Sequence, residues 1–171
     1  LNYAGQLEIP MHFFNYYGFY TGSFYPKETN VSGKLLVNQV NNYTNTDKRL
    51  MIAKEFIIAA SHNILRNIRY YNERGCDLNQ CIAEIKALRS VIAQTQDINE
   101  LMGIEGSIRR CYYNDWSKII NQNIDFEKRT KRPPDNMINA LISFVNSLVY
   151  TTCLSEIYKT QLNPAVSYLH S

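Results

Sequence analysis

Apolar residues recur every three or four positions along much of the chain, a spacing typical of amphipathic helices. The longest stripe predicts a helix over residues 48–72, with Gly75 as its stop. Its members are Leu50, Ala53, Ile57, Ala60, Ile64, Ile68 and Tyr71. A second stripe runs from Ile82 to Ile92 and predicts a helix capped by Asp77 or Asn79.

Three further segments carry helical signals. Residues 97–121 form an apolar-periodic stretch with weak points at Gly103 and Gly106, and a short helix is predicted around residues 35–40. Residues 136–160 are apolar nearly all round, so we expect this helix at the centre of the bundle, in contact with the others.

Polar residues interrupt this last helix, which argues against a membrane span. They are Asn139, Ser143, Asn146, Ser147 and Tyr150, at helical spacing. Either they form interhelical hydrogen bonds or they line a polar site. In both cases the buried amides need hydrogen-bond partners.

The first quarter of the chain has a different pattern. Dense aromatic residues predict two strands, 10–15 and 19–25, with Gly18 near the turn and Gly22 at a bulge or a close backbone approach. Because two strands alone are marginally stable, we expect the hairpin to be the edge of a larger sheet whose other strands precede Leu1. Residues 26–33 have linker composition, which places a domain boundary near Ser32.

Composition narrows the class of protein. The 171 residues are 45% hydrophobic, enough for a folded core, and the net charge of +3 confines any nucleic-acid site to a local patch. The four cysteines form no C-x-x-C pair, and we expect reduced, mostly buried, cytoplasmic thiols. Because the chain begins at Leu1 rather than at a methionine, we expect an internal piece of a longer protein.

Two residues are candidate cation ligands. Glu105 lies between Gly103 and Gly106; if a helix restarts there, its dipole favours the ionised acid by about 0.3–1 kcal/mol, and Gly106 would let a phosphate approach. The alternative is an ordinary first-turn acid. The His170 imidazole could ligate a transition metal or share a divalent ion with carboxylates, or it could be an ordinary surface or core histidine.

Basic side chains gather in two places. The residues are Arg109 and Arg110, and then Lys128, Arg129, Lys131 and Arg132. Such groups near a carboxylate suggest contacts to a phosphate backbone, although charged runs are often simply solvated. Motifs for a serine nucleophile, a phosphate loop or a dinucleotide site are missing, so these enzyme classes are improbable.

Short strings in a fixed order make the chain resemble one family, the CRISPR-associated integrase and endonuclease of spacer acquisition, the "Cas one" family. The strings are Phe13-Phe14-Asn15-Tyr16-Tyr17-Gly18, Gly22-Ser23-Phe24-Tyr25-Pro26, Ser32-Gly33-Lys34-Leu35-Leu36 with Gln39, Arg49-Leu50 with Ala53-Lys54, Leu101-Met102-Gly103-Ile104-Glu105-Gly106 with Arg109 and Tyr112-Tyr113, Arg132-Pro133-Pro134 with Asn139-Ala140-Leu141, and Leu162-Asn163-Pro164 with Leu169-His170. They span nearly the whole chain.

The resemblance implies a mainly α fold with a small β part. Residues 1–31 would be the end of a β-rich N-terminal domain, and residues 32–171 a helical-bundle catalytic domain truncated before its end. It further implies a Mg²⁺ or Mn²⁺ ion held by Glu105 and His170, with a third acidic ligand beyond Ser171. Arg109, Arg110, Lys128, Arg129, Lys131 and Arg132 would then contact the DNA backbone.

The function that the resemblance implies is metal-dependent DNA cleavage and integration of new spacers into a CRISPR array, an antiviral defence. The partners would be spacer-precursor and repeat-array DNA, a second copy of the chain and the small "Cas two" adaptation protein, in the cytoplasm and without a membrane. The alternative is a non-enzymatic helical module that binds DNA or a protein, or a catalytically dead fragment, since one ligand is missing.

Overall fold

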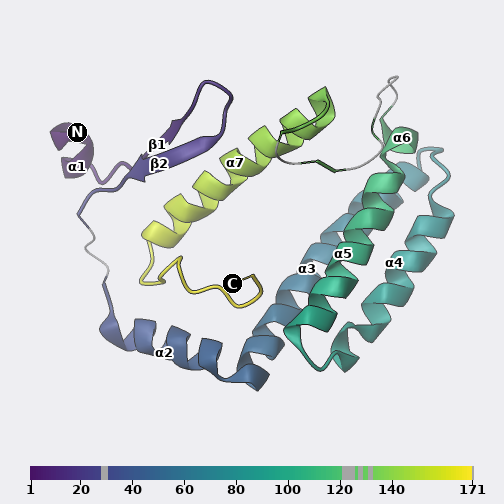
Figure 1. Ribbon diagram of the computed structural model, residues 1–171, viewed down its shortest axis with the longest axis horizontal. Coiled ribbons are helices and arrows are strands. Elements are labelled where there is room, and N and C mark those ends of the chain that lie inside the picture. Colours follow the sequence, from purple (N-terminus) through teal and green to yellow (C-terminus); the bar gives the residue numbers. More distant parts are fainter. Residues whose placement is uncertain (28–30, 121–125, 127–128, 131–132, 171) are drawn as a thin grey trace. The chain divides into compact units, whose positions relative to one another are not determined.

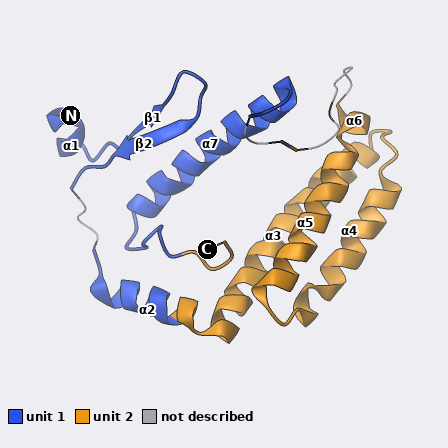
Figure 2. Ribbon diagram, viewed as in Figure 1, with its two compact units in different colours: residues 1–41, 130–166 blue, residues 42–129, 167–171 orange. Residues whose placement is uncertain are grey.

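The computed structural model describes residues 1–27, 31–120, 126, 129–130 and 133–170 (Figure 1). It is mainly helical, with one two-stranded sheet, as the sequence predicts. The chain divides into two compact units (Figure 2): residues 1–41 and 130–166 form unit 1, and residues 42–129 and 167–171 form unit 2. These units pair the hairpin with a late helix, so they are not the domains inferred from sequence, whose boundary near Ser32 stays a prediction.

Unit 2 is built on three helices: α3 (Thr46–Asn72), α4 (Asn79–Val91) and α5 (Ile98–Asn114). The short elements η1 (Ile92–Gln94) and α6 (Trp116–Ile119) follow α4 and α5. The predicted stripe of α3 is confirmed at Ala53, Ile57 and Ile68, which are buried. Midway along the helix the stripe drifts, because 3.6 residues per turn make Ser61 rather than Ala60 the buried residue.

Two apolar clusters form the core of unit 2. The first, cluster A, consists of Leu65, Ile68, Leu78, Cys81, Ile85, Ile108 and Cys111. The second, cluster B, consists of Ala53, Ile57, Ile92 and Leu101. Ile104 of α5 packs against both clusters, so this helix joins the two parts of the core.

The helix starts follow capping chemistry in most places. Asn45 and Asp97 accept the backbone N–H groups of Lys48 and Glu100, both at 2.9 Å, as N-cap residues do. The predicted cap of α4 was wrong: Leu78 occupies the N-cap position, and its buried side chain belongs to cluster A. Burial of an apolar residue therefore outweighs the loss of a polar cap at this helix.

The weak points at Gly103 and Gly106 do not interrupt the helix, because α5 continues unbroken from Ile98 to Asn114. Burial of Leu101, Ile108 and Cys111 offsets the helix penalty of about 1 kcal/mol for each glycine. Glu105 consequently lies in the middle of the helix, beyond the first turn, and the expected dipole effect does not apply to it.

In unit 1 the predicted hairpin is confirmed as β1 (Met11–Phe14) and β2 (Tyr20–Phe24), preceded by the short α1 (Asn2–Gln6). The strands are antiparallel, and the register shifts between Phe13 and Phe14, beside the predicted bulge at Gly22. Gly18 adopts φ 77°, and a Cβ there would lie 2.7 Å from the Phe144 ring, so both backbone and space require glycine.

The helix that accompanies the hairpin is α7 (Met137–Tyr158), while α2 (Gly33–Thr44) links this unit to α3. His12 of β1 lies between two hydroxyls, with Nδ1 2.6 Å from Ser23 Oγ and Nε2 2.8 Å from Ser155 Oγ of α7. Tyr20 and Tyr150 meet edge to face, at 5.4 Å between ring centroids. These contacts fasten the hairpin to one side of α7.

We expected α7 at the centre of the helical bundle, in contact with the other helices; the structure groups α7 with the hairpin in unit 1, and the expectation stays a prediction. The described members of clusters A and B come from other segments. Only one side of α7 meets the hairpin, and Leu141, Val145 and Val149 on the other side are 55%, 45% and 55% exposed. By length and composition α7 could cross a membrane, but this is weak support, and the expectation of no span stays a prediction.

Three residues of the polar stripe of α7 make hydrogen bonds to partners close by in the sequence. Ser143 Oγ donates to Asn139 O at 2.9 Å, and Ser147 Oγ donates to Ser143 O at 3.1 Å. Asn139 is fully buried and donates to Asp135 Oδ1 at 2.7 Å, just before the helix begins. Intrahelical bonding of this kind is the usual alternative for Ser and Asn inside a helix.

The four cysteines are free, as expected, but they differ in burial. Cys81 and Cys111 lie in cluster A, with their Sγ atoms 2.6 Å apart. Burial raises the pKa of both thiols above the ordinary value. Cys76 is half-buried, whereas Cys153 on α7 is exposed, contrary to the expectation of mostly buried thiols.

Candidate metal and nucleic-acid site

Glu105 lies on α5 at the edge of the buried face of that helix. Its side chain is 15% exposed, and Oε1 pairs with Nε of Arg109 one turn later. The preceding residue, Ile104, packs into both core clusters, so the backbone that carries the carboxylate is fixed. Little solvent reaches this acid, and a cation is the partner that such a carboxylate favours.

His170 follows a short segment that is fastened to α3. Arg49 Nε donates to the carbonyl oxygen of Tyr168 at 2.9 Å. The next side chain, Leu169, packs against cluster B, and His170 itself is exposed. The imidazole therefore projects from an anchored piece of backbone into solvent, where a ligand can reach it.

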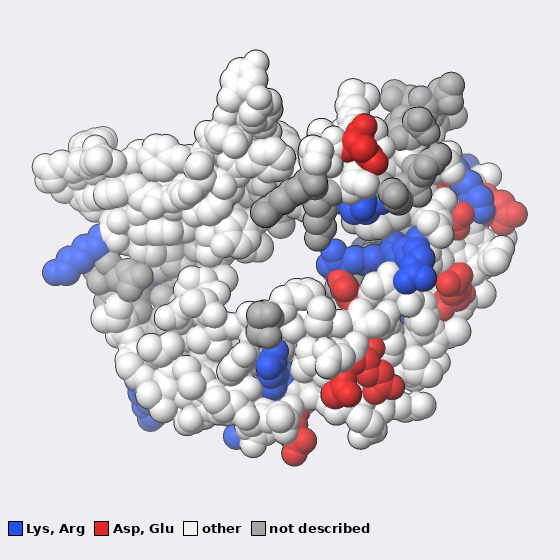
Figure 3. Space-filling model, viewed as in Figure 1, with Lys and Arg blue, Asp and Glu red and all other residues white. Residues whose placement is uncertain are grey.

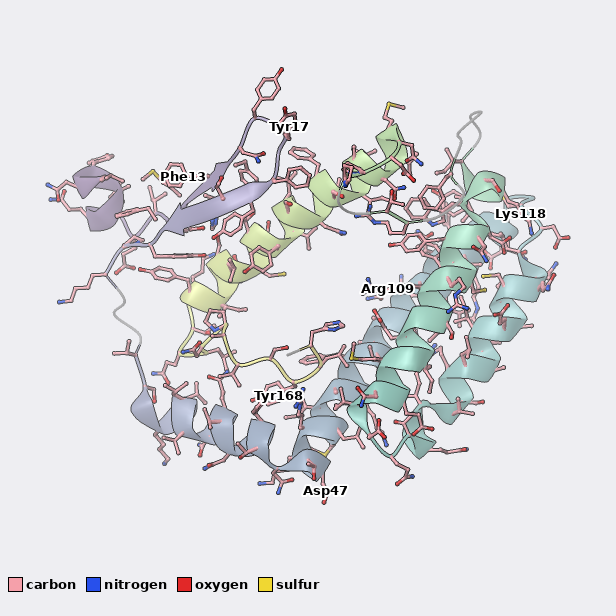
Figure 4. The ribbon with its side chains drawn as sticks, viewed as in Figure 1. Phe13, Tyr17, Asp47, Arg109, Lys118 and Tyr168 are labelled. Atoms are coloured by element: carbon pink, nitrogen blue, oxygen red, sulfur yellow. The ribbon has the colours of Figure 1, made fainter. Side chains whose placement is uncertain are left out.

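Glu105 and His170 belong to the same unit and rest on the same core. Ile104 precedes Glu105, Leu169 precedes His170, and both of these apolar residues pack against cluster B. Figure 4 shows Arg109 on α5 and Tyr168 on the segment that leads to His170. The fold thus holds the neighbours of the two predicted ligands against one cluster, although they are 65 positions apart in sequence.

The donor set fits a divalent ion in part. A carboxylate oxygen suits Mg²⁺ and Mn²⁺, and an imidazole is tolerated by Mn²⁺. Within the described ranges, no group of three or more His, Cys, Asp or Glu side chains could hold a metal. Because Mg²⁺ usually keeps several waters and uses one or two carboxylates, two side chains can contribute to such a site without completing it.

The six predicted DNA contacts have different outcomes. Arg109 is 55% exposed beside Glu105, whereas Arg110, five residues after Glu105, lies about 140° around the helix and is exposed on another side. Figure 3 shows a patch of Lys and Arg atoms over α5. Arg129 is half-buried; Lys128, Lys131 and Arg132 lie outside the described residues. All six assignments stay predictions.

The two glycines that flank Glu105 in the sequence each have open space beside their backbone. A Cβ built at Gly103 or Gly106 would meet nothing within 4 Å. Neither glycine is required by helix packing, and both have backbone angles available to any residue. The missing side chains therefore leave room for a bulky group to approach the α5 backbone, as the sequence suggested for Gly106.

Sequence reasoning treated Arg49 as part of a family string and gave it no role in the site. Its partner, Tyr168, lies 119 positions away, so no local pattern could connect them. The only available signal was the shared order of the strings that contain Arg49 and His170.

Comparison with known proteins matches this arrangement to one family. The family described as "CRISPR associated protein Cas1" matches residues 1–171. A relative from Fusobacterium nucleatum, named CRISPR-associated endonuclease Cas1, is 63% identical over 170 residues, which cover 99% of this chain and 50% of the relative. The chain thus spans about half the length of the curated relatives it matches.

Solved structures match this chain to the same family. A Cas1 protein from Thermotoga maritima is 39% identical, with a TM-score of 0.82 over 99% of this chain and 53% of that chain. Two structures share the fold at lower identity. "Casposase bound to integration product" has a TM-score of 0.81 at 20% identity, over 99% of this chain and 48% of its own. "Cas6-RT-Cas1--Cas2 complex" has a TM-score of 0.73 at 21% identity, over 96% of this chain and 19% of its own.

The family match extends over every residue, and the strings around Glu105 and His170 lie on the anchored elements of unit 2. This chain therefore belongs to the Cas1 family of CRISPR-associated proteins.

Proposed function

We propose that the full-length protein is a divalent-metal-dependent DNA endonuclease and integrase that inserts new spacers into a CRISPR array. The observation that carries the proposal is the packing of Ile104 and Leu169, the neighbours of Glu105 and His170, against one cluster. Membership of the Cas1 family supports the reaction class, because close relatives are named endonucleases.

In this proposal Glu105 and His170 are the catalytic metal ligands that this chain supplies, and a third acidic ligand follows Ser171. Bound Mg²⁺ or Mn²⁺ supplies charge stabilisation to a phosphodiester oxygen and to the leaving 3′ oxygen. Glu105 offers hard carboxylate oxygens, the ligand type that both ions prefer. His170 offers an imidazole nitrogen on a backbone that is anchored at the two preceding residues.

The basic residues hold DNA near these ligands. Arg109, Arg110 and Arg129, with Lys128, Lys131 and Arg132, contact phosphates and position the duplex without reading its sequence. The partners are spacer-precursor and repeat-array DNA, a second copy of the chain and the small Cas2 protein; the fold shared with a Cas2-containing complex is consistent with the last. The location is the cytoplasm, with no membrane partner.

Removing the metal tests the reaction class. The full-length protein, with its Cas2 partner, is given a short DNA duplex with free 3′ hydroxyls and a plasmid that carries a repeat array. We expect strand transfer with Mn²⁺ or Mg²⁺ and none with EDTA, while DNA retention in a gel-shift assay persists in both. DNA retention without nicking or transfer under any metal would favour the helical binding module instead.

Substitution of Gly106 separates stability from DNA approach. Gly106→Ala should raise the free energy of unfolding of α5 by about 0.5–1 kcal/mol, because the helix gains propensity and the new Cβ meets no neighbour. If the open space admits DNA, the same change should weaken DNA binding. In the full-length protein, hydrogen exchange of α5 measures the change in stability, and DNA affinity measures the change in binding. The matched control is Ser90→Ala on α4. Unchanged DNA affinity with a more stable helix would contradict the proposed approach.

A further inference from the structure

Arg49 makes two defined contacts near the start of α3. Its Nε donates to the carbonyl oxygen of Tyr168 at 2.9 Å. Its guanidinium carbon lies 4.5 Å from the centre of the Tyr43 ring. The guanidinium thus lies over the Tyr43 ring, and this cation–π contact restrains the side chain whose N–H donates to Tyr168.

The segment that Arg49 holds is the one that leads to His170. Tyr168 is anchored through its carbonyl group, and the following Leu169 is anchored through its side chain in cluster B. With two consecutive residues fixed in this way, the backbone of His170 starts from a defined position. The conformational entropy of this segment is then lost during folding and not when a ligand binds.

We propose that Arg49 is a positioning residue that preorganises His170 for a divalent cation by holding the carbonyl group of Tyr168. This inference rests on the proposed function, in which His170 is a metal ligand. Arg49 acts on the backbone two residues before the ligand and does not itself touch the metal. Outer residues that orient a ligand commonly change metal affinity by about 10–100-fold when they are removed.

An arginine suits this role better than a lysine. Only the guanidinium combines a planar face for Tyr43 with an N–H in a fixed direction. A lysine at the same position keeps the positive charge but directs a flexible ammonium group. Comparison of the two side chains therefore distinguishes geometry from charge.

The test measures Mn²⁺ affinity directly, in the full-length protein without DNA. Free Mn²⁺ is followed by electron paramagnetic resonance for the parent, Arg49→Met, Arg49→Lys and the neighbouring exposed control Lys48→Met. We expect the Kd for Mn²⁺ to rise about tenfold in Arg49→Met and by a smaller factor in Arg49→Lys, with Lys48→Met unchanged. Thermal unfolding of each variant is recorded alongside; if Arg49→Met does not fold, Arg49→Lys carries the test.

A double-mutant cycle shows whether Arg49 works through His170. If it does, Arg49→Met in a His170→Ala background should not weaken Mn²⁺ binding beyond His170→Ala alone. Additive losses, or an unchanged Kd in Arg49→Met while His170→Ala binds weakly, would overturn the positioning role. If His170→Ala itself binds Mn²⁺ as the parent does, the metal-site assignment fails, and with it the proposed function. Faster hydrogen exchange at residues 168–170 in Arg49→Met, with α4 unaffected, is the expected metal-independent result.

Discussion

Glu105→Gln should reduce strand transfer by the full-length protein at least about a hundredfold, because a metal ligand can supply several kcal/mol of charge stabilisation in the transition state. The amide keeps the shape of the side chain but removes the charge that attracts the cation. DNA retention should remain close to that of the parent. His170→Ala should have the same pattern of effects. Quantification of integrated product at fixed Mn²⁺ gives the comparison.

The substitution also breaks the ion pair with Arg109, and this effect must be separated. Because Arg109 is 55% exposed, the pair contributes at most about 0.5 kcal/mol, so loss of folding cannot explain a hundredfold effect. Arg109→Gln breaks the same pair and leaves the carboxylate in place, so it should keep Mn²⁺ affinity. Glu55→Gln removes a similar charge from an exposed site on α3 and should keep full strand transfer. Normal integration by Glu105→Gln would refute the metal-site assignment.

Leu101→Ala should lower the stability of unit 2 by about 2–5 kcal/mol, the range for a buried leucine that leaves a cavity. Leu101 is fully buried in cluster B, with Ala53 and Ile57 of α3 and Ile92 of η1. Leu169 packs against this cluster, so the substitution should also loosen the segment that leads to His170. Hydrogen exchange of α3 and α5 in the full-length protein measures the first effect, and Mn²⁺ affinity measures the second.

The control for this prediction removes apolar atoms from an exposed site. Val91→Ala at the end of α4, where the side chain is 39% exposed, should change stability by less than about 1 kcal/mol. If Leu101→Ala changed stability by less than about 1 kcal/mol, cluster B would not support α5, and it would not be the common support of Glu105 and His170.

Much of the helical fold could be predicted because its signals are local. The stripe through Ala53, Ile57 and Ile68 repeats at helical spacing, and the hairpin is marked by aromatic residues around Gly18. Errors arose where packing outweighed local preference. A polar N-cap was expected for α4, but the buried Leu78 occupies that position. Burial of apolar neighbours likewise keeps α5 whole through the weak points at Gly103 and Gly106.

The contact between α7 and the hairpin could not be predicted for another reason. A helix that is apolar on every side is expected to be buried, but its sequence does not indicate which element packs against it. In this chain β1 and β2 cover one side, through residues such as His12 and Tyr20. That pairing joins positions more than 100 residues apart, which periodicity within one helix cannot reveal.

The two candidate metal ligands could be predicted from the sequence, but the contacts that hold them in place could not. Glu105 and His170 were named from short strings, but the contacts that hold them came only from the structure. Arg49 reaches Tyr168 across 119 positions of sequence, and Leu169 reaches cluster B across more than 60. Long-range contacts of this kind leave no periodic trace, so a ligand can be named before anything is known of what orients it.

Because the cysteines differ in burial, one of them can be labelled selectively with a fluorescent dye. Thiolates are the reactive species toward maleimides, and the raised pKa of Cys81 and Cys111 keeps that pair protonated and inert at neutral pH. Cys153 projects into solvent from α7, so among the described cysteines it is the one that a maleimide dye reaches most readily. A fluorophore on Cys153 would report on α7 and the hairpin while the core that carries Glu105 stays chemically untouched.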